Sequence, residues 1–261
     1  MPDPPRLTSR QHPAVKRCRR IARRREPDDP VLLDGEHLVL EAHRAGVPLD
    51  LVLTAGPAHG PVAAAARAAA EAWEVSAAAL EAASPVRSPS GIVALARWRP
   101  APLEAVLGRP GLIVGLVDVQ DPGNLGAVIR SAHALGAAGV VALDATADPG
   151  GWRALRGAMG STFHLPVARG GRTEALALAA RAGAAVTATA IAGGTPLAGH
   201  AFGARTLLLL GHEGAGLPPD VLAAASGRLT IPMRPGVDSL NVAVTASLVL
   251  YEATRAHGVS R

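Results

Sequence analysis

Aromatic residues are scarce in this chain of 261 residues. Phe, Trp and Tyr make up 2% of it, whereas hydrophobic residues of all kinds make up 49%. The core is therefore aliphatic, and a nucleic-acid site built mainly on stacked aromatic rings is disfavoured. With only 18% charged residues, the composition indicates a folded chain, long enough for one large domain or two ordinary ones.

Cysteine and lysine occur once each, as Cys18 and Lys16. A single cysteine forms neither an intrachain disulfide nor a zinc cluster, so we expect a cytoplasmic protein without a bound metal. A P-loop needs a lysine after its glycines, and Lys16 follows no glycine run, which excludes a Walker-type nucleotide site. Arginine supplies the other basic residues, and the net charge of +5 favours an anionic partner.

Long apolar runs are also missing. Residues 1–7 are rich in proline and polar residues, without the apolar core of a signal peptide. No uninterrupted apolar stretch reaches the roughly 18 residues needed to cross a bilayer. The alanine-rich run over residues 62–72 is too short and contains Arg67 and Glu71. We therefore expect no membrane partner.

A basic segment without acidic residues runs from Arg6 to Arg25. The spacing of Val15, Cys18 and Ile21 predicts a weakly amphipathic helix within it. One interpretation is a solvated basic helix. The favoured one is phosphate contact, because such an unbalanced segment repels itself without an anionic partner. The candidate RNA-binding residues are Arg10, Lys16, Arg17, Arg20 and Arg24.

Apolar strands alternate with helical segments along the rest of the chain, which predicts an α/β protein. Three prolines in residues 99–110 predict a linker, and we divide the chain into domains over residues 1–105 and 106–261. In the first domain we expect strands over 31–33, 49–54, 74–76 and 92–96 and helices over 35–45 and 62–72. In the second we expect strands over 112–117, 140–143, 185–190, 206–210 and 228–231, and helices over 124–135, 152–159, 174–182, 218–225 and 239–256. The continuous apolar strand 112–117 is typical of a parallel sheet covered on both faces.

Three polar strings lie near the ends of predicted strands in the second domain. They are Asn124-Leu-Gly-Ala-Val-Ile-Arg130, Gly211-His-Glu-Gly-Ala-Gly216, and Ile231-Pro-Met233 with Ser239-Leu-Asn-Val-Ala243. Together they resemble the signature of the SpoU (TrmH) family of RNA ribose 2′-O-methyltransferases, part of the SPOUT superfamily. The resemblance covers about 150 residues, 112–256, and residues 160–167 look like the family's middle strand.

The first domain resembles the family's RNA substrate-binding domain, a small α/β fold shared with some ribosomal proteins. The matching pieces are residues 33–38 and 88–93. The resemblance implies a parallel-sheet SPOUT domain whose C-terminal part, roughly residues 207–256, forms a deep trefoil knot, although chains almost never thread loops. It also implies a homodimer with active sites close to the subunit interface, and rRNA as substrate in preference to tRNA.

The resemblance implies S-adenosylmethionine as the cofactor, held largely by backbone groups of the second and third strings. The matching cofactor-binding positions are Gly211, Gly216, Ile231, Met233, Leu240 and Asn241. Glycine lets a backbone approach a ligand closely, although these glycines are also ordinary turn residues. The spacing of Gly211, Gly214 and Gly216 does not fit the G-x-G-x-x-G string of a dinucleotide site.

Arg130 is the catalytic arginine by resemblance. Because a guanidinium rarely gives up its proton, we expect Arg130 to contact phosphate and stabilise the developing alkoxide. The alternative is a plain surface arginine. Asn124 would orient Arg130, cap a helix or do both. Glu213 would fix the second string through backbone hydrogen bonds or pair with an arginine. Ser239 and Asn241 are placed beside cofactor and RNA, with helix capping as the alternative for Ser239.

The sequence therefore predicts an enzyme that methylates a ribose 2′-hydroxyl in structured RNA, with 23S rRNA favoured. Two alternatives stay open: a tRNA 2′-O-methyltransferase, and a non-catalytic RNA-binding or ribosome-assembly factor of the same fold. The presence of Asn124, Arg130 and Glu213 favours an enzyme, because a degenerate homologue would have lost them.

Overall fold

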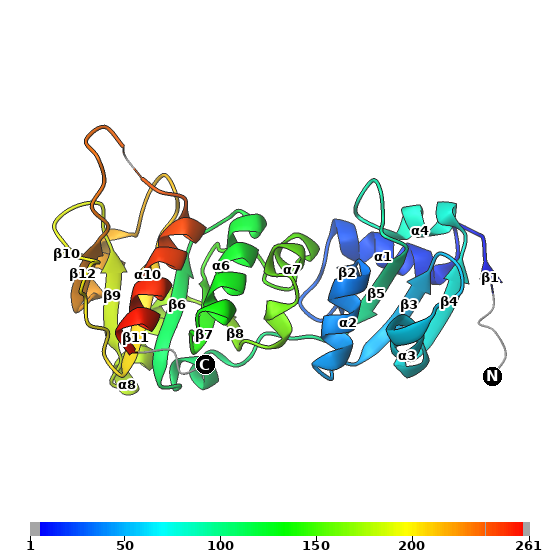
Figure 1. Ribbon diagram of the computed structural model, residues 1–261, viewed down its shortest axis with the longest axis horizontal. Coiled ribbons are helices and arrows are strands. Elements are labelled where there is room, and N and C mark those ends of the chain that lie inside the picture. Colours follow the sequence, from blue (N-terminus) through cyan, green and yellow to red (C-terminus); the bar gives the residue numbers. More distant parts are fainter. Residues whose placement is uncertain (1–5, 238, 258–261) are drawn as a thin grey trace. The chain divides into compact units, whose positions relative to one another are not determined.

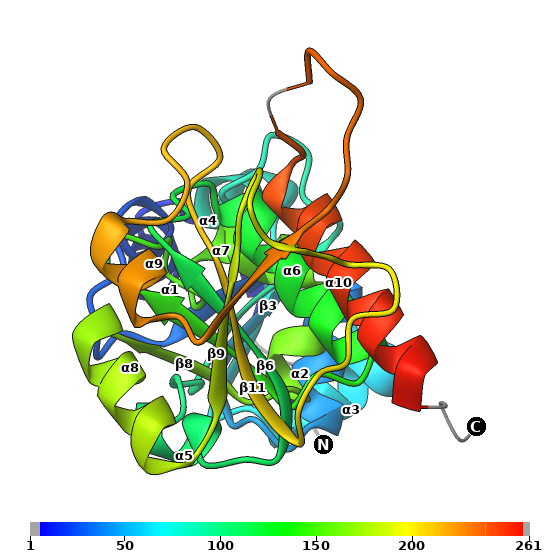
Figure 2. The same ribbon diagram turned by 90° about the vertical axis from the view of Figure 1, so that its left-hand side faces the viewer.

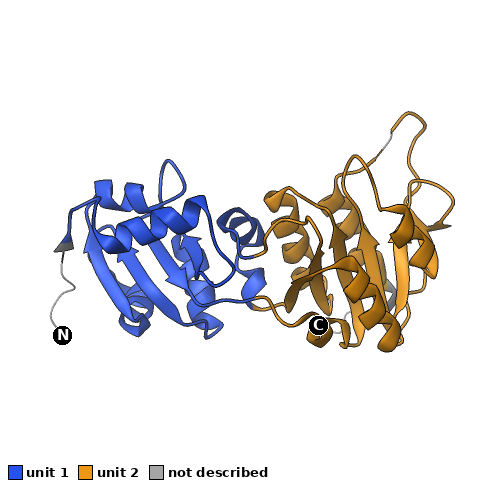
Figure 3. Ribbon diagram, turned by 180° about the vertical axis from the view of Figure 1, so that it is seen from behind, with its two compact units in different colours: residues 1–99, 150–163 blue, residues 100–149, 164–261 orange. Residues whose placement is uncertain are grey.

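The computed structural model describes residues 6–237 and 239–257 (Figure 1). The chain forms two compact units (Figure 3). Unit 1 contains residues 1–99 and 150–163, and unit 2 contains residues 100–149 and 164–261. Each unit is an α/β fold, as the sequence predicts.

Unit 1 is built on a five-stranded sheet whose strand order is β1-β4-β3-β5-β2. Strand β5 runs antiparallel to β2 and β3, and the other pairings are parallel. Two helices, α1 (Pro13–Arg23) and α4 (Ala77–Ala83), pack together on one face, and α2 (Glu36–Arg44) and α3 (Gly60–Ala68) cover the other (Figure 1). The strands are β1 (Arg6–Leu7), β2 (Val31–Asp34), β3 (Leu49–Thr54), β4 (Glu71–Val75) and β5 (Ile92–Ala96).

Two features of unit 1 differ from the sequence-based expectation. The helix expected over residues 62–72 ends at Ala68, because β4 begins at Glu71 and pairs with Leu51 of β3. Pairing within the sheet here overrides the helix preference of an alanine run. Helix α7 (Trp152–Ala158) lies in the second half of the sequence but packs against β2, the edge strand of unit 1.

Unit 2 is built on a seven-stranded, wholly parallel sheet of order β10-β12-β9-β11-β6-β7-β8. Helices α6 (Pro122–Ala134) and α10 (Val242–His257) pack together on one face; α5 (Leu103–Leu107), α8 (Arg172–Arg181) and α9 (Pro219–Ala224) cover the other (Figure 2). The strands are β6 (Gly111–Val117), β7 (Gly139–Leu143), β8 (Val167–Gly170), β9 (Ala185–Thr189), β10 (Thr195–Pro196), β11 (Arg205–Leu210) and β12 (Gly227–Thr230).

Two segments of unit 2 correct the sequence-based expectation. The segment expected as a linker, residues 99–110, contains helix α5, whose side chains Leu103, Val106 and Leu107 are buried in the core of unit 2. Its prolines precede and follow the helix, where proline is tolerated. The stretch 160–167, expected as a middle strand, contains a 3-10 turn over Ser161–Phe163, and strand β8 begins only at Val167.

Candidate active site

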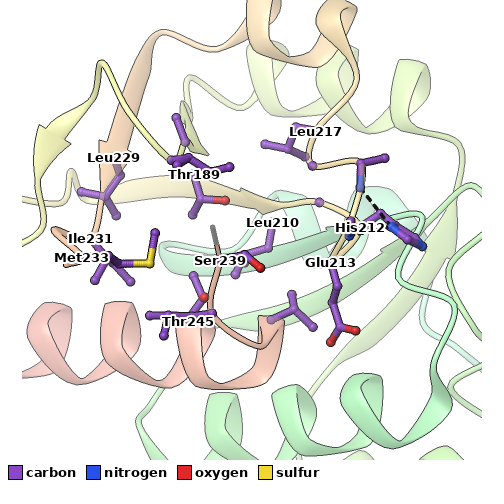
Figure 4. A pocket seen from close by; sticks show the side chains of 18 residues that line it. Thr189, Leu210, His212, Glu213, Leu217, Leu229, Ile231, Met233, Ser239 and Thr245 are labelled. Atoms are coloured by element: carbon purple, nitrogen blue, oxygen red, sulfur yellow. Dashed lines mark hydrogen bonds between the residues drawn. The ribbon is translucent and has the colours of Figure 1, made fainter. Parts of the chain in front are cut away.

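A pocket of about 450 Å³ opens at the carboxyl ends of three neighbouring strands of unit 2, β9, β11 and β12. Ligand sites of parallel sheets typically lie at this edge. The residues just before α10 complete the lining. Ile231 and Met233 lie toward one end of the pocket, and His212 and Glu213 lie toward the other (Figure 4). Seven predicted site residues line it: Gly211, Glu213, Gly216, Ile231, Met233, Ser239 and Leu240.

The loop that follows β11 folds back on itself. The amide of Gly216 donates to the carbonyl of His212 at 2.9 Å. The ring nitrogen Nδ1 of His212 accepts from the amides of Gly214 and Ala215 at 3.0 and 3.3 Å. A Cβ atom on Gly211 would lie 2.3 Å from the carbonyl of Gly216, so only glycine fits there. The loop therefore presents a fixed set of backbone groups to the pocket.

Glu213 joins the three sequence motifs at the pocket. Its Oε1 atom accepts hydrogen bonds from the side-chain amides of Asn124 and Asn241, the latter at 3.0 Å. Asn241 also donates to the side-chain oxygen of Asn124 at 3.0 Å. The residues come from helix α6, the loop after β11 and the turn before α10, so this network holds the three motif segments together.

The capping roles considered for Asn124 and Ser239 are wrong. Helix α6 begins at Pro122, and the Asp121 carboxylate caps it by accepting from the amide of Asn124 at 2.8 Å. Helix α10 begins at Val242, so Ser239 lies in the preceding loop. The cap of α10 is Asn241, whose Oδ1 accepts from the amides of Ala243 and Val244. Asp and Asn are about equally favoured at a helix N-cap, so residue type alone does not distinguish Asp121 from Asn124.

Arg130 lies on α6, nearly two turns beyond Asn124. Its side chain is exposed, it forms no hydrogen bond or ion pair with the residues that the structure describes, and it does not line the pocket. The structure thus brings Asn124, Glu213 and Asn241 together but leaves Arg130 outside this group.

The pocket suits a small molecule with apolar and polar parts. Its volume falls within the range of about 300–1,000 Å³ that is usual for such ligands. Leu210, Leu229 and Ile231 supply apolar walls, and Glu213 places a carboxylate at the rim. Gly211 lets the loop after β11 close against the backbone of Gly216, which has a positive φ of 69°. These features fit S-adenosylmethionine, which combines a flat nucleoside with a charged tail.

Sequence reasoning missed several residues that line the pocket, among them Thr189, Ile191, His212 and Thr245. Thr189 ends β9, and its hydroxyl donates to the carbonyl of Leu209 at 3.1 Å. The signal that would have found it is its place at the carboxyl end of a parallel strand.

Within residues 6–237 and 239–257, no group of three acidic, histidine or cysteine residues is placed to bind a metal.

The basic segment forms helix α1 in unit 1. Three of its five candidate RNA-binding residues form ion pairs: Arg17 with Asp50 at 3.4 Å, Arg20 with Asp29 at 2.5 Å, and Arg24 with Glu26 at 3.0 Å. The other two, Arg10 and Lys16, are exposed and form no ion pair with a described residue.

Over the same described part of the chain, no helix is both long and apolar enough to cross a membrane.

Comparison with known proteins decides the family. Residues 111–251 match the SpoU rRNA Methylase family, and residues 12–94 match the MRM3-like substrate binding domain. This chain belongs to the SpoU rRNA methylase family. A relative from Bacillus subtilis, the 23S rRNA (guanosine(2553)-2′-O)-methyltransferase RlmP, is 30% identical over 94% of this chain and 97% of its own.

Two solved structures of this family contain the cofactor. The AdoMet-bound rRNA methyltransferase from Sinorhizobium meliloti is 30% identical, with a TM-score of 0.87 over 98% of each chain. The SpoU methyltransferase AviRb from Streptomyces viridochromogenes, in complex with AdoMet, is 26% identical, with a TM-score of 0.84 over 96% of this chain and 100% of its own. The predicted family, SPOUT fold, enzyme class and cofactor of this SpoU protein are thereby confirmed.

Proposed function

We propose that this SpoU enzyme transfers a methyl group from S-adenosylmethionine to a ribose 2′-hydroxyl of 23S rRNA. The observation that carries the proposal is the pocket at which Glu213 joins all three motif segments. Relatives from Bacillus subtilis and Streptomyces laurentii are named as 23S rRNA 2′-O-methyltransferases, and unit 1 matches a substrate-binding domain. This substrate would place the enzyme in the cytoplasm.

When bound, the cofactor supplies a methyl group attached to a sulfonium sulfur, and this sulfur departs readily as a neutral thioether. The chain's residues then have to hold the ribose oxygen in line with that methyl group and exclude competing orientations. Glu213, Asn124 and Asn241 fix the geometry of the pocket wall. Arg130 keeps its proton, contacts the RNA phosphate and stabilises negative charge on the 2′-oxygen, while the hydroxyl proton passes to solvent water as the oxygen takes the methyl group.

A homodimer is part of this proposal. Helix α10 exposes three large side chains, Val244, Leu248 and Tyr251, whose exposed fractions are 48%, 41% and 60%. Their spacing places them on one stripe of the helix. A second copy of the chain is the proposed cover for this stripe. Because Arg130 does not line its own pocket and lies on α6, which packs against α10, we assign it to the pocket of the second subunit.

The trefoil knot over residues 207–256 is proposed on one further observation. The segment between β9 and β11 passes along α10, where the amide of Gly199 donates to Glu252 Oε1 at 3.1 Å (Figure 2). Meanwhile the start of α10 is held beside β11 through Asn241 and Glu213. Helix α10 thus contacts the segment between β9 and β11 near its C-terminal end and the loop after β11 at its start. A C-terminus threaded through a loop produces this arrangement.

The test is methyl transfer from labelled S-adenosylmethionine to RNA from a strain that lacks the gene, with rRNA and tRNA separated. We expect label in large-subunit rRNA at one nucleotide that resists alkaline cleavage, since a methylated 2′-oxygen no longer attacks its phosphate. Label confined to tRNA would keep the chemistry and overturn the substrate. Absence of label in both, with cofactor binding intact, would favour the non-catalytic alternative.

A further inference from the structure

Helix α1 (Pro13–Arg23) carries five cations, and Arg24, the extended residue that ends the helix, adds a sixth; we divide the six into two rows. The helix buries Ala14, Val15, Cys18 and Ile21 against the sheet of unit 1, so its cations occupy the remaining surface. With 3.6 residues per turn, residues separated by three and seven positions share a row. One row, here named the paired row, contains Arg17, Arg20 and Arg24. The other, named the free row, contains Lys16, Arg19 and Arg23.

Each arginine of the paired row has a carboxylate partner within unit 1, and Asp50 is shared between Arg17 and Arg97. Asp50 at the start of β3 accepts from Arg17, and Asp29 before β2 binds Arg20 through two hydrogen bonds. The hydrogen bonds from Arg20 lower the pKa of Asp29 to about 2. Glu26 pairs with Arg24. These carboxylates cancel the field of the paired row and anchor α1 to the segments that follow it.

The free row has no such partners. Lys16 and Arg23 are exposed and Arg19 is half-buried, and none of them forms an ion pair or side-chain hydrogen bond with a described residue. Lys16 and Arg23 lie about 10 Å apart along the helix axis, with Arg19 between them. Like charges three and four residues apart on a helix repel one another, so the row favours anions in its vicinity.

We propose that the free row, Lys16, Arg19 and Arg23, contacts the phosphates of the RNA substrate, and that the paired row instead stabilises unit 1. The proposal rests on the proposed function in taking RNA as the partner. A polyanion fits better than a single ion, because phosphates along one strand neutralise three cations together and release their counter-ions. The assignment changes the RNA-binding set expected from the sequence: Arg19 and Arg23 enter it, and Arg17, Arg20 and Arg24 leave it.

Two triple variants of the full chain test this assignment. One is Lys16→Gln, Arg19→Gln and Arg23→Gln, and the other is Arg17→Gln, Arg20→Gln and Arg24→Gln. Both remove three positive charges from residues 16–24, and glutamine has nearly the same helix propensity as lysine and arginine. The probe is 23S rRNA transcribed in vitro, and its dissociation constant is measured over a range of salt concentrations.

For the free-row variant we expect RNA binding to be weaker by about tenfold or more. The salt slope, which is the slope of log association constant against log salt concentration, should fall in magnitude by about two to three, roughly one unit for each lost phosphate contact. For the paired-row variant we expect a slope changed by less than about one unit and a melting temperature lowered by a few degrees. Because that variant removes the arginine partners of Asp29 and Glu26, whereas Asp50 keeps Arg97, the charge-neutral pair Arg20→Gln and Asp29→Asn serves as a second control. It should leave the slope unchanged.

Equal loss of slope in both triple variants would overturn the proposal, since RNA would then respond only to net charge. Unchanged slopes in both would also overturn it and assign the free row to solvent or to a protein partner. Failure of the proposed function gives a different result. In that case the wild-type chain binds the RNA with the expected slope but transfers no methyl group to it.

Discussion

The side-chain amide of Asn241 donates to the side-chain oxygen of Asn124 at 3.0 Å, across a sequence separation of 117 residues. Both amides also donate to the same oxygen of Glu213. Each asparagine thus has its orientation fixed by two partners. Glu213 acts as a shared acceptor that holds helix α6, the loop after β11 and the start of α10 in fixed relative positions.

Two replacements of Glu213 test whether the enzyme needs its hydrogen bonds or its negative charge. Glu213→Ala removes an acceptor used by two amides, and we expect kcat/KM to fall by about tenfold to hundredfold. Glu213→Gln keeps a carbonyl acceptor of the same length and is expected to retain activity within about fivefold. Steady-state methyl transfer and cofactor affinity are the measurements. A glutamine variant as inactive as the alanine variant would show that the negative charge is required.

Gly211 and Gly214 form a matched pair for testing the pocket loop. A Cβ atom on Gly211 would lie 2.3 Å from backbone atoms of Gly216, whereas one on Gly214 would lie no closer than 3.7 Å to the ring of His212. We expect Gly211→Ala to weaken cofactor binding by about tenfold or more, because the backbone has to move. Gly214→Ala should bind within about twofold of wild type. Calorimetric titration with S-adenosylmethionine distinguishes them, and equal affinities would contradict this description of the loop.

Arg130→Ala is expected to abolish methyl transfer while leaving the cofactor dissociation constant within about twofold, because the proposed contacts of Arg130 are with the RNA phosphate and the 2′-oxygen and not with the cofactor. The control is Arg109→Ala, which removes another exposed arginine of unit 2 that has no ion pair among the described residues. Its turnover should be unchanged. Loss of cofactor binding in the Arg130 variant would assign that residue a structural role.

Mixed dimers test whether Arg130 serves the second subunit. Arg130→Ala subunits are expected to be inactive alone, and Glu213→Ala subunits to keep about 1–10% of the wild-type activity. If Arg130 acts across the interface, a dimer of one subunit of each kind contains one complete site, and activity rises well above that level on mixing. If Arg130 acts within its own subunit, neither site is complete, and mixed samples stay no more active than Glu213→Ala alone.

Asp29 makes stability depend on pH. Its pKa in the folded chain is about 2, chiefly because of the hydrogen bonds from Arg20, against about 3.9 in an unfolded chain. A lowered folded-state pKa stabilises the fold above the unfolded value, and that stabilisation is lost as the pH falls toward 2. We expect Asp29→Asn to lower the melting temperature by about 2–4 °C near pH 7, with the difference shrinking below pH 4.

The neighbouring residue Asp28 provides the control for this measurement. Its carboxylate has no ion pair with a described residue, although its backbone carbonyl accepts from Arg99. Asp28→Asn should therefore leave the melting temperature nearly unchanged between pH 7 and pH 3. A difference between Asp29→Asn and wild type that persists at full size at low pH would show that the ion pair is not its source.

The strands were predictable from local apolar patterns, and the pocket residues from the resemblance of the three strings to the SpoU family. The apolar run 112–117 corresponds to β6, and the polar strings near strand ends meet at one pocket. Helix capping was not predictable to the residue, since Asp121 and Asn241 each compete with a polar neighbour for the same role. The division of the arginines was also hidden, because one of their partners, Asp50, lies 33 residues from Arg17.

Helix α7 determines how this protein can be divided or recombined. It is encoded among the residues of unit 2, yet it packs against β2, an edge strand, and the carbonyl of Met159 just beyond it lies 3.1 Å from Nε2 of His37. A gene fragment that stops at Arg99 would leave that edge open to pairing with other chains. Exchange of the substrate-binding module between related enzymes therefore requires two grafts, residues 1–99 and residues 150–163, because a single crossover point yields an incomplete module.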